Sequence, residues 1–204
     1  MIAIVDYGSG NIAAIANIYK KLKIPHVVSG DPAVLADAER YILPGVGAFD
    51  TVMQDLTRLG IVETLNAEVI GKGKKAMGIC VGMQILANSS DEGKEPGLGW
   101  IPGKIQRIDD TRINAAPKLP HMGWNSIKMR DQQPLLTDVN LGRGFYFLHN
   151  YYFAPASDED VIATVHYGDD LPCGVRRGNV FGFQFHPEKS HDNGMAVFKN
   201  FAEI

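Results

Sequence analysis

The stretch KAMGICVGMQIL, residues 75–86, carries the pattern that decides the fold. An apolar run at the start of this stretch leads into the pentapeptide GICVG at 78–82, which has Cys80 at its centre. Residues with helical spacing follow directly. A nucleophile between two glycines at a strand-to-helix turn is typical of a nucleophile elbow, whose side chain projects above the strand ends. The turn also places the sulfur at a helix N-terminus, where the macrodipole favours the reactive thiolate. The alternative is a small buried cysteine in a glycine-rich turn.

Around this turn, the first half of the chain alternates short apolar runs with helical patterns. We expect strands at Ile2–Val5, His26–Val28, Arg40–Leu43 and Lys75–Ile79. Helical spacing covers residues 12–22, 48–59 and 61–70, with Asn11 as the cap of the first helix and Pro25 as its stop. Because strands that alternate with helices form parallel βαβ units, the pattern predicts a parallel sheet with helices on both faces.

The second half of the chain is different, because residues 93–103 are rich in Gly and Pro and strand-like pieces then follow closely. We expect these strands at Lys104–Ile108, Trp124–Met129, Phe145–His149, Val161–Tyr167 and Asn179–Phe185, and a helix from about Asn193 to Phe201. The crowded strands predict an antiparallel extension of the sheet. The sequence therefore predicts an α/β fold with a mixed, mostly parallel central sheet flanked by helices, in a single domain over residues 1–204.

The composition is that of an ordinary globular protein, with 45% hydrophobic and 21% charged residues among 204. A net charge of −3 offers no basic surface, which argues against nucleic acid or an anionic membrane as a partner. No apolar run approaches the roughly 18 residues of a membrane span, and the start at Met1–Asp6 is too short and acidic for a signal peptide. Cys80 and Cys173 match neither a disulfide framework nor a zinc pair. We expect a cytoplasmic protein with reduced thiols.

A base for the cysteine is available at the end of the apolar run 181–185, where His186, Pro187 and Glu188 follow. Pro187 favours an extended conformation at His186, and in an extended segment residues i and i+2 point the same way. The imidazole would take the thiol proton while the carboxylate orients the ring. The alternative is a strand-terminal histidine beside a solvated Glu188. Together with Cys80, the pair predicts acyl transfer.

Such chemistry requires an oxyanion hole. The backbone N–H of Val81, directly after the nucleophile, is the usual first donor. The segment Pro44–Gly47 follows a strand and could supply a second N–H, because glycine lets the backbone approach a substrate closely. An ordinary βα turn is the alternative for that segment.

Taken together, these motifs resemble a known family. GICVGMQ at 78–84 with FHPE at 185–188 resembles the class I, or triad, glutamine amidotransferases. More narrowly, DYGSGN at 6–11, LPGVGAF at 43–49, PHMGWN at 120–125, YFLH at 146–149 and FHPEKS at 185–190 resemble the glutaminase subunits of imidazole glycerol phosphate synthases. The resemblance covers essentially the full chain in order. It implies that glutamine is hydrolysed through a thioester on Cys80, and that ammonia passes to a separate (β/α)₈-barrel cyclase subunit, in a heterodimer that serves histidine biosynthesis.

The resemblance also implies roles for individual residues. Cys80 would be the nucleophile, His186 the base and Glu188 its orienting acid. The α-amino acid end of glutamine would be held by Gln84 with backbone groups of Asn150, Tyr151 and Tyr152, and the oxyanion would be framed by Gly47 and Val81. The side of the molecule that faces the partner and the ammonia exit would carry Trp124, Asn125, Tyr146 and Lys189. Trp124 and Tyr146 would otherwise be core aromatics, and Lys189 a solvated charge.

No cofactor is expected. No metal is expected either, because His186 and His191 lack a third ligand at suitable spacing. Two stretches, NYYF at 150–153 and KSHDNG at 189–194, look more like copies associated with surface-sugar biosynthesis, which supply ammonia to a different amidotransferase. The alternative function is therefore an ammonia-supplying paralogue for such an enzyme.

Three other function classes are less favoured. GSGNIA at 8–13 matches the dinucleotide pattern G-x-G-x-x-A, but Asp31, the matching acid, lies beyond the second strand and precedes Pro32. A thioester hydrolase with an elbow cysteine usually places its acid before the histidine, whereas here the acid follows. A pure binding protein would keep its function after alkylation of Cys80.

Overall fold

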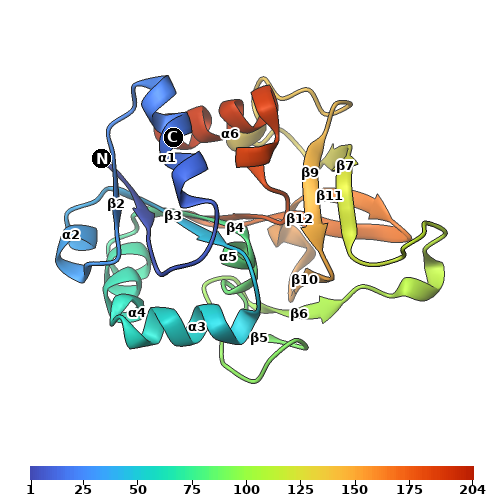
Figure 1. Ribbon diagram of the computed structural model, residues 1–204, viewed down its shortest axis with the longest axis horizontal. Helices are drawn as coiled ribbons and strands as arrows, with labels where there is room; N and C mark the ends of the chain where they lie inside the picture. The colour runs from blue at the N-terminus through green and yellow to red at the C-terminus, as the bar shows by residue number, and fades with distance from the viewer.

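The central sheet grows outward from the buried N-terminal strand β1 in the computed structural model, which describes residues 1–204 (Figure 1). Eight strands lie in the order β2-β1-β3-β4-β13-β12-β11-β8. Their bounds are β1 Ile2–Val5, β2 His26–Ser29, β3 Arg40–Gly45, β4 Lys75–Cys80, β8 Ile127–Met129, β11 Val161–Tyr167, β12 Asp169–Arg177 and β13 Val180–Phe183. Pairing is parallel from β2 to β13 and antiparallel from β13 to β8. The expected mixed, mostly parallel sheet with an antiparallel extension is confirmed.

Two smaller sheets pack beside the central one. The first has the order β10-β6-β5, with β5 Ser89–Ser90, β6 Gly103–Arg107 and β10 Tyr151–Pro155. The second pairs β7 His121–Asn125 with β9 Phe145–His149. The expectation that all second-half strands extend the central sheet was therefore wrong for residues 104–108 and 145–149. The expected strand 124–129 is broken at Ser126, because Asn125 pairs with Phe145 whereas Ile127 pairs with Val165.

Helices cover both faces of the central sheet, as the βαβ pattern predicts. Figure 1 shows α1 and α6 on one face and α3 and α4 on the other. Their bounds are α1 Ile12–Leu22, α2 Pro32–Ala36, α3 Phe49–Arg58, α4 Ile61–Leu65, α5 Val81–Gln84 and α6 His191–Glu203, with a π turn at Asn66–Gly71 and 3₁₀ turns at Asp110–Arg112, Pro134–Leu136, Asp158–Asp160 and Pro187–Lys189. No helix is long and apolar enough to span a membrane.

One hydrophobic core joins the two halves of the chain. It contains 52 buried residues, among them Ile4 of β1, Met77 of β4, Val175 of β12 and Phe201 of α6. Burying apolar surface against a shared sheet is the main favourable contribution to folding. Because every strand group contributes to the same core, the chain is a single domain.

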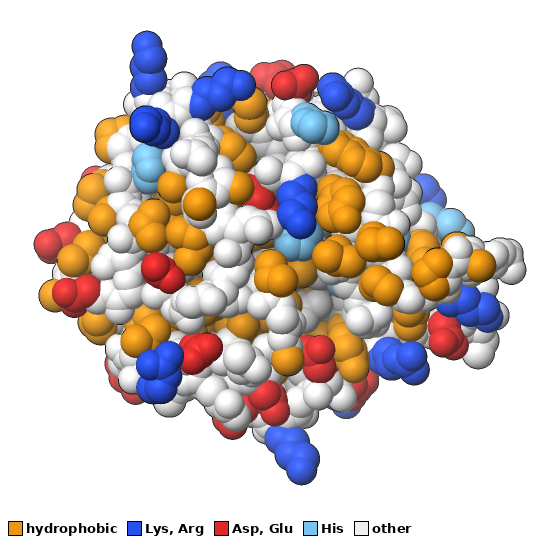
Figure 2. Space-filling view, in the orientation of Figure 1, with side chains coloured by type: hydrophobic (Ala, Val, Ile, Leu, Met, Phe, Trp, Pro, Cys, Tyr) orange, Lys and Arg blue, Asp and Glu red, His pale blue; other side chains and the backbone are white.

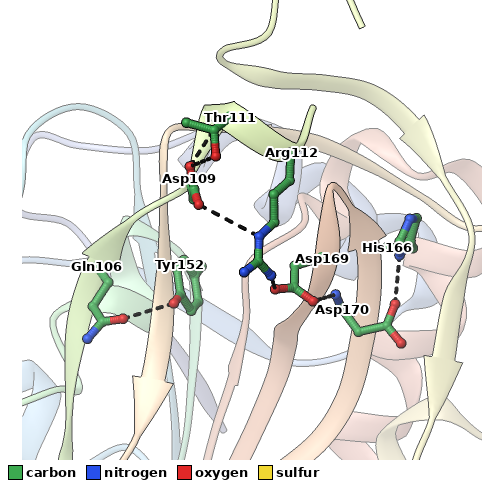
Figure 3. A network of polar contacts seen from close by, with 8 residues as sticks. All are labelled: Gln106, Asp109, Thr111, Arg112, Tyr152, His166, Asp169 and Asp170. Carbon is green, nitrogen blue, oxygen red and sulfur yellow. Dashed lines mark hydrogen bonds and ion pairs between the residues drawn. The ribbon is translucent and has the colours of Figure 1, made fainter. Parts of the chain in front are cut away.

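An exposed polar network ties the segment 109–112 to the turn between β11 and β12 (Figure 3). Arg112 Nη1 donates to Asp169 at 2.7 Å, and His166 Nδ1 lies 2.8 Å from Asp170. Exposed pairs of this kind contribute about 0–1 kcal/mol each. We therefore expect the network to order this edge of the molecule rather than to determine the fold.

Candidate active site

The carboxyl ends of β1, β3, β4 and β13 lie side by side, and the segments that leave them surround one cavity. The strand register explains the placement, because Gly45 of β3 lies opposite Cys80 and Phe183 of β13 lies opposite Ile79. Ligands of open parallel sheets bind at this edge. The cavity has a volume of about 230 Å³, which suits a small metabolite. In Figure 2 this face has a hollow near its middle, with His and Lys or Arg side chains beside it and hydrophobic side chains around it.

Cys80 sits at a strained turn between β4 and α5. Its φ of 55° and ψ of −112° lie in a region that non-glycine residues rarely adopt. A Cβ on Gly78 would lie 2.2 Å from the carbonyl oxygen of Gly82, and a Cβ on Gly82 would lie 1.8 Å from the carbonyl oxygen of Leu43. Both glycines are therefore required for the close approach that defines a nucleophile elbow. The helix that follows has only four residues, so its dipole stabilises a thiolate at Cys80 less than His186 does.

His186 and Glu188 form a buried pair beside the sulfur. His186 Nδ1 lies 2.8 Å from Glu188 Oε1, and the two side chains are 3% and 2% exposed. The expected extended geometry holds only at His186, because residues Pro187–Lys189 form a 3₁₀ turn. That turn, rather than strand alternation, brings the carboxylate back to the ring.

Asn11 holds the same carboxylate from the other side. Its Nδ2 donates to Glu188 Oε1 at 2.7 Å across 177 residues of sequence. The sequence suggested Asn11 as the cap of α1, but its side chain makes no capping hydrogen bond. A cap would use the Oδ1 of Asn11 as an acceptor, whereas the contact with the carboxylate uses Nδ2 and fixes the side chain in a different orientation.

The electrostatics of the pair favour an imidazolium next to a carboxylate. Burial lowers the pKa of His186, but the hydrogen bonds to Cys80 and Glu188 outweigh burial and raise that pKa to about 10. Burial likewise raises the pKa of Glu188, but the contacts with His186 and Asn11 reverse this and hold it below its usual range. Hydrogen bonds to the charged forms are the cause in both cases. His186 is thus able to take and keep a proton from Cys80.

Two further groups approach the sulfur. Gln184 Nε2 donates to Cys80 Sγ at 3.7 Å, and Cys80 Sγ lies 3.9 Å from the carbonyl oxygen of Leu148. Gln184 is fully buried and belongs to the segment that links β13 to His186. The carboxamide donor suits a sulfur that carries negative charge.

The cavity brings together most of the residues expected to bind substrate, namely Gly47, Val81, Gln84, Asn150 and Tyr151. Tyr152 is the exception, since it does not line the cavity. Its hydroxyl donates to Gln106 Oε1 at 2.8 Å, as Figure 3 shows. Successive side chains of a strand point to opposite faces, so the side chain of Tyr152 is directed away from the site that Tyr151 lines. A contact between the backbone of Tyr152 and glutamine stays a prediction.

The cavity is also lined by residues that were not expected from the sequence to bind substrate, namely Asn11, Val46, Glu92, Leu148 and His149. Asn11, Val46, Leu148 and His149 lie inside motifs that carry the family resemblance, which was the available signal. Glu92 lies outside these motifs. Its carboxylate accepts a hydrogen bond of 2.9 Å from the backbone N–H of Phe49, at the start of α3.

Three of the four residues expected near a partner lie side by side, namely Trp124, Tyr146 and Lys189. The side chain of Asn125 instead donates to the carbonyl oxygen of His166 at 3.0 Å. Trp124 is 44% exposed and stacks on His191 with ring centroids 5.3 Å apart. Lys189 lines the cavity, and its Nζ lies 5.4 Å from the ring centroid of Tyr146. Met122, which was not among the expected residues, is 60% exposed on the same strand as Trp124 and Asn125. Exposed Met and Trp side chains around a cavity mouth are typical of a protein-binding surface.

The family comparison agrees with the fold and with the geometry of this cavity. Residues 3–204 match the family model of the class I glutamine amidotransferases. The chain belongs to this family and is a glutamine amidotransferase with the Cys-His-Glu triad characteristic of it.

Relatives of high similarity narrow the group. The chain is 48% identical to imidazole glycerol phosphate synthase subunit HisH of Bdellovibrio bacteriovorus over 204 residues, with all of both chains covered. It is 45% identical to imidazole glycerol phosphate synthase subunit HisH 2 of Pseudomonas aeruginosa over 207 residues, again with full coverage of both. A crystal structure of a glutamine amidotransferase superposes with a TM-score of 0.73 at 21% identity, covering 100% of this chain and 99% of that one, which supports the fold.

Proposed function

We propose that this chain hydrolyses glutamine to glutamate and ammonia, and that it delivers the ammonia to the cyclase subunit of imidazole glycerol phosphate synthase in histidine biosynthesis. The observation that carries the proposal is that Cys80 and His186 line one cavity, with the buried carboxylate of Glu188 paired to His186. The full-length relatives named as subunits of that synthase support the choice of pathway.

The reaction follows from the positions of these groups. His186 takes the proton of Cys80, and the sulfur attacks the side-chain amide carbon of glutamine. The backbone N–H groups of Val81 and Gly47 stabilise the oxyanion of the tetrahedral intermediate. His186 then protonates the leaving ammonia, and water hydrolyses the thioester by the same steps in reverse order. Glu188 keeps the imidazole oriented and stabilises its charged form.

The loop 6–11 holds the oxyanion segment Pro44–Gly47 in place. Ser9 Oγ donates to the carbonyl oxygen of Val46 at 2.6 Å and accepts from its N–H at 2.9 Å. The hydroxyl of Tyr7 donates to the carbonyl oxygen of Pro44. Because the N–H of Val46 is engaged by Ser9, the N–H of Gly47 is the donor of this segment that remains for the oxyanion.

Asn11→Leu should lower glutaminase kcat/KM by about tenfold, since one hydrogen bond to a charged group contributes roughly 1.5–3 kcal/mol. The lost donor favoured the charged carboxylate of Glu188, so the pKa of Glu188 should rise. The acid limb of the pH–rate profile should therefore move to higher pH, and the profile is the measurement. Asn17→Leu, an exposed position on α1, is the control. An acid limb at the same pH in Asn11→Leu would contradict the assigned role.

The partner is expected to dock on the surface around Trp124, Asn125, Tyr146 and Lys189, and we propose a barrel-type cyclase there. A barrel presents its active site at one end, which allows ammonia to pass directly from the cavity mouth. Both cysteines are free, which is consistent with our proposal of a cytoplasmic location.

Trp124→Ala should raise the Kd for the cyclase subunit by about tenfold or more, because a partly exposed Trp beside a cavity is a frequent hot spot. Lys189→Ala should have a smaller effect in the same direction. Isothermal titration with the cyclase subunit measures both. Ile70→Ala, which also truncates an exposed apolar side chain but just before the amino end of β4, is the control. Unchanged affinity in both test variants would place the partner on another surface.

The experiment that tests the function uses this chain and the cyclase subunit of the same organism. We expect the mixture to form a heterodimer and to make imidazole glycerol phosphate from glutamine, with turnover far above that of the chain alone. If the chain hydrolyses glutamine but binds a sugar-modifying amidotransferase instead of the cyclase, the surface-sugar function replaces the histidine pathway. If it does not hydrolyse glutamine with either partner, the proposal fails.

A further inference from the structure

Two histidines outside the triad face each other in the interior. His121 of β7 and His149 of β9 lie opposite one another in the strand register and are 3% and 6% exposed. His121 Nδ1 lies 2.9 Å from His149 Nε2. The His121 ring is stacked between Tyr167 and Phe147, with centroid distances of 4.0 and 4.6 Å. The pair is therefore fixed in place by packing.

The neighbours of the pair determine which nitrogens carry protons. His149 Nδ1 lies 2.8 Å from the carbonyl oxygen of Tyr151, which only accepts, so this nitrogen is the donor. His149 Nε2 then accepts from His121 Nδ1, and His121 Nε2 accepts from the side-chain amide of Asn125 at 3.2 Å. A proton added to either ring would meet another donor. Burial agrees with this, since it lowers the pKa of His121 to about 4 and that of His149 to about 3.

The chain of hydrogen bonds continues from Tyr151 to the nucleophile. The carbonyl oxygen of Tyr151 also accepts from Gln84 Nε2 at 3.3 Å, and Gln84 Nε2 donates to Gln184 Oε1 at 3.1 Å. Gln184 Nε2 in turn donates to Cys80 Sγ. Four side chains and one carbonyl group thus connect Asn125 of β7 to the sulfur.

The direction of these hydrogen bonds determines which atom of Gln84 is available to a substrate in the cavity. Both contacts of Gln84 use its nitrogen, so its Oε1 has no partner in the protein and is left for the cavity that Gln84 lines. A carbonyl oxygen accepts from an ammonium group, such as the α-amino group of an amino acid. A displaced Tyr151 carbonyl would remove one of the two acceptors that hold Gln84 in this orientation.

We propose that His121 and His149 are positioning residues for glutamine, which hold the Tyr151 carbonyl and through it the Gln84 side chain. The proposal rests on the glutaminase function proposed above. Without His121, the buried Nε2 of His149 loses its donor, and an unpaired buried acceptor favours rotation of the ring toward another partner. Rotation of the ring would withdraw its Nδ1–H from the Tyr151 carbonyl oxygen, and the strand that lines the cavity would lose this support.

Alkylation of Cys80 by two reagents separates positioning from reactivity. A chloromethyl ketone analogue of glutamine must occupy the amino acid subsite before the thiolate displaces its chloride. Iodoacetamide, from which the thiolate displaces iodide, needs only a reactive sulfur. In His121→Leu we expect the chloroketone rate constant to fall by about tenfold, with the iodoacetamide rate constant within twofold of wild type. His121→Asn, which keeps an N–H near the position of Nδ1, should recover most of the chloroketone rate.

The control is His166→Leu, the same change at a side chain that is 69% exposed and outside the chain of hydrogen bonds. Equal slowing by both reagents in His121→Leu, or no slowing by either, would overturn the positioning role. If the wild-type chain shows no glutamine-protected reaction with the chloroketone, the glutaminase proposal fails, and this inference fails with it.

Nitrogen NMR of the wild-type chain tests the same inference without a substitution that could impair folding. We expect both histidines to be neutral, with the proton on Nδ1, from pH 6 to pH 8. A proton on Nε2 of either ring, or titration of either ring in that interval, would overturn the proposal. His166, which is exposed and hydrogen-bonded to Asp170, provides the internal reference.

Discussion

Cys80→Ser is expected to abolish glutamine-dependent synthesis by the assembled enzyme, while synthesis from ammonium salt at alkaline pH continues at the wild-type rate. Serine is nearly isosteric with cysteine, so the variant should fold and bind its partner. A hydroxyl is far harder to ionise than a thiol, and glutamine turnover should fall by about 10³-fold or more. The partner needs only ammonia, so its own chemistry should be unaffected. Both assays are made on one preparation of the complex.

His186→Ala should give the same pattern, because the thiol loses its base and the leaving ammonia loses its proton donor. Glu188→Ala should be milder, since the carboxylate orients the ring without transferring the proton itself. The outcome that contradicts the assignment is loss of ammonia-dependent synthesis together with the glutamine reaction. Cys80 would then be structural or would act in the synthase step.

The parallel half of the fold was predictable from the sequence because its strands are short continuous apolar runs. Strand β1 is buried at all four residues, and β3 and β4 are buried at all but their first. Strand β12 escaped notice because Pro172 and Gly174 interrupt its pattern, and its pairing with β11 has register shifts near Ala163. Proline and glycine weaken the local preference for a strand, so only the neighbouring strands on both sides specify β12.

The candidate site was predictable where the chemistry requires particular residues in a short motif, as at Cys80 and at His186 with Glu188. Asn11 was not, because its contact with Glu188 joins residues that are 177 positions apart. The pairing of His121 with His149 was hidden for the same reason, since it depends on the register of β7 against β9. A single sequence contains no local signal for such contacts.

The glycines of the elbow make a second prediction, which concerns stability. Gly82→Ala should lower the free energy of unfolding by about 3 kcal/mol or more, because the new Cβ would lie 1.8 Å from the carbonyl oxygen of Leu43. Neither the β3 backbone nor the α5 backbone is a flexible side-chain end that is able to move aside. Relief would require β3 and α5 to separate, which also moves the oxyanion segment that follows β3.

For a domain of this size, that loss corresponds to a decrease in Tm of roughly 6–12 °C, which differential scanning calorimetry measures directly. Gly71→Ala is the matched control, since its Cβ would meet only the carbonyl oxygen of Asn66 at 3.8 Å, an ordinary contact. Gly82→Ala should also lose most of its reaction with iodoacetamide even below its Tm, because the turn no longer presents the sulfur of Cys80. A variant that melts with the wild type and keeps its reactive thiol would mean that β3 and α5 are less tightly apposed than the structure requires. Contacts other than the one between β3 and α5 would then have to hold Cys80 at its positive φ.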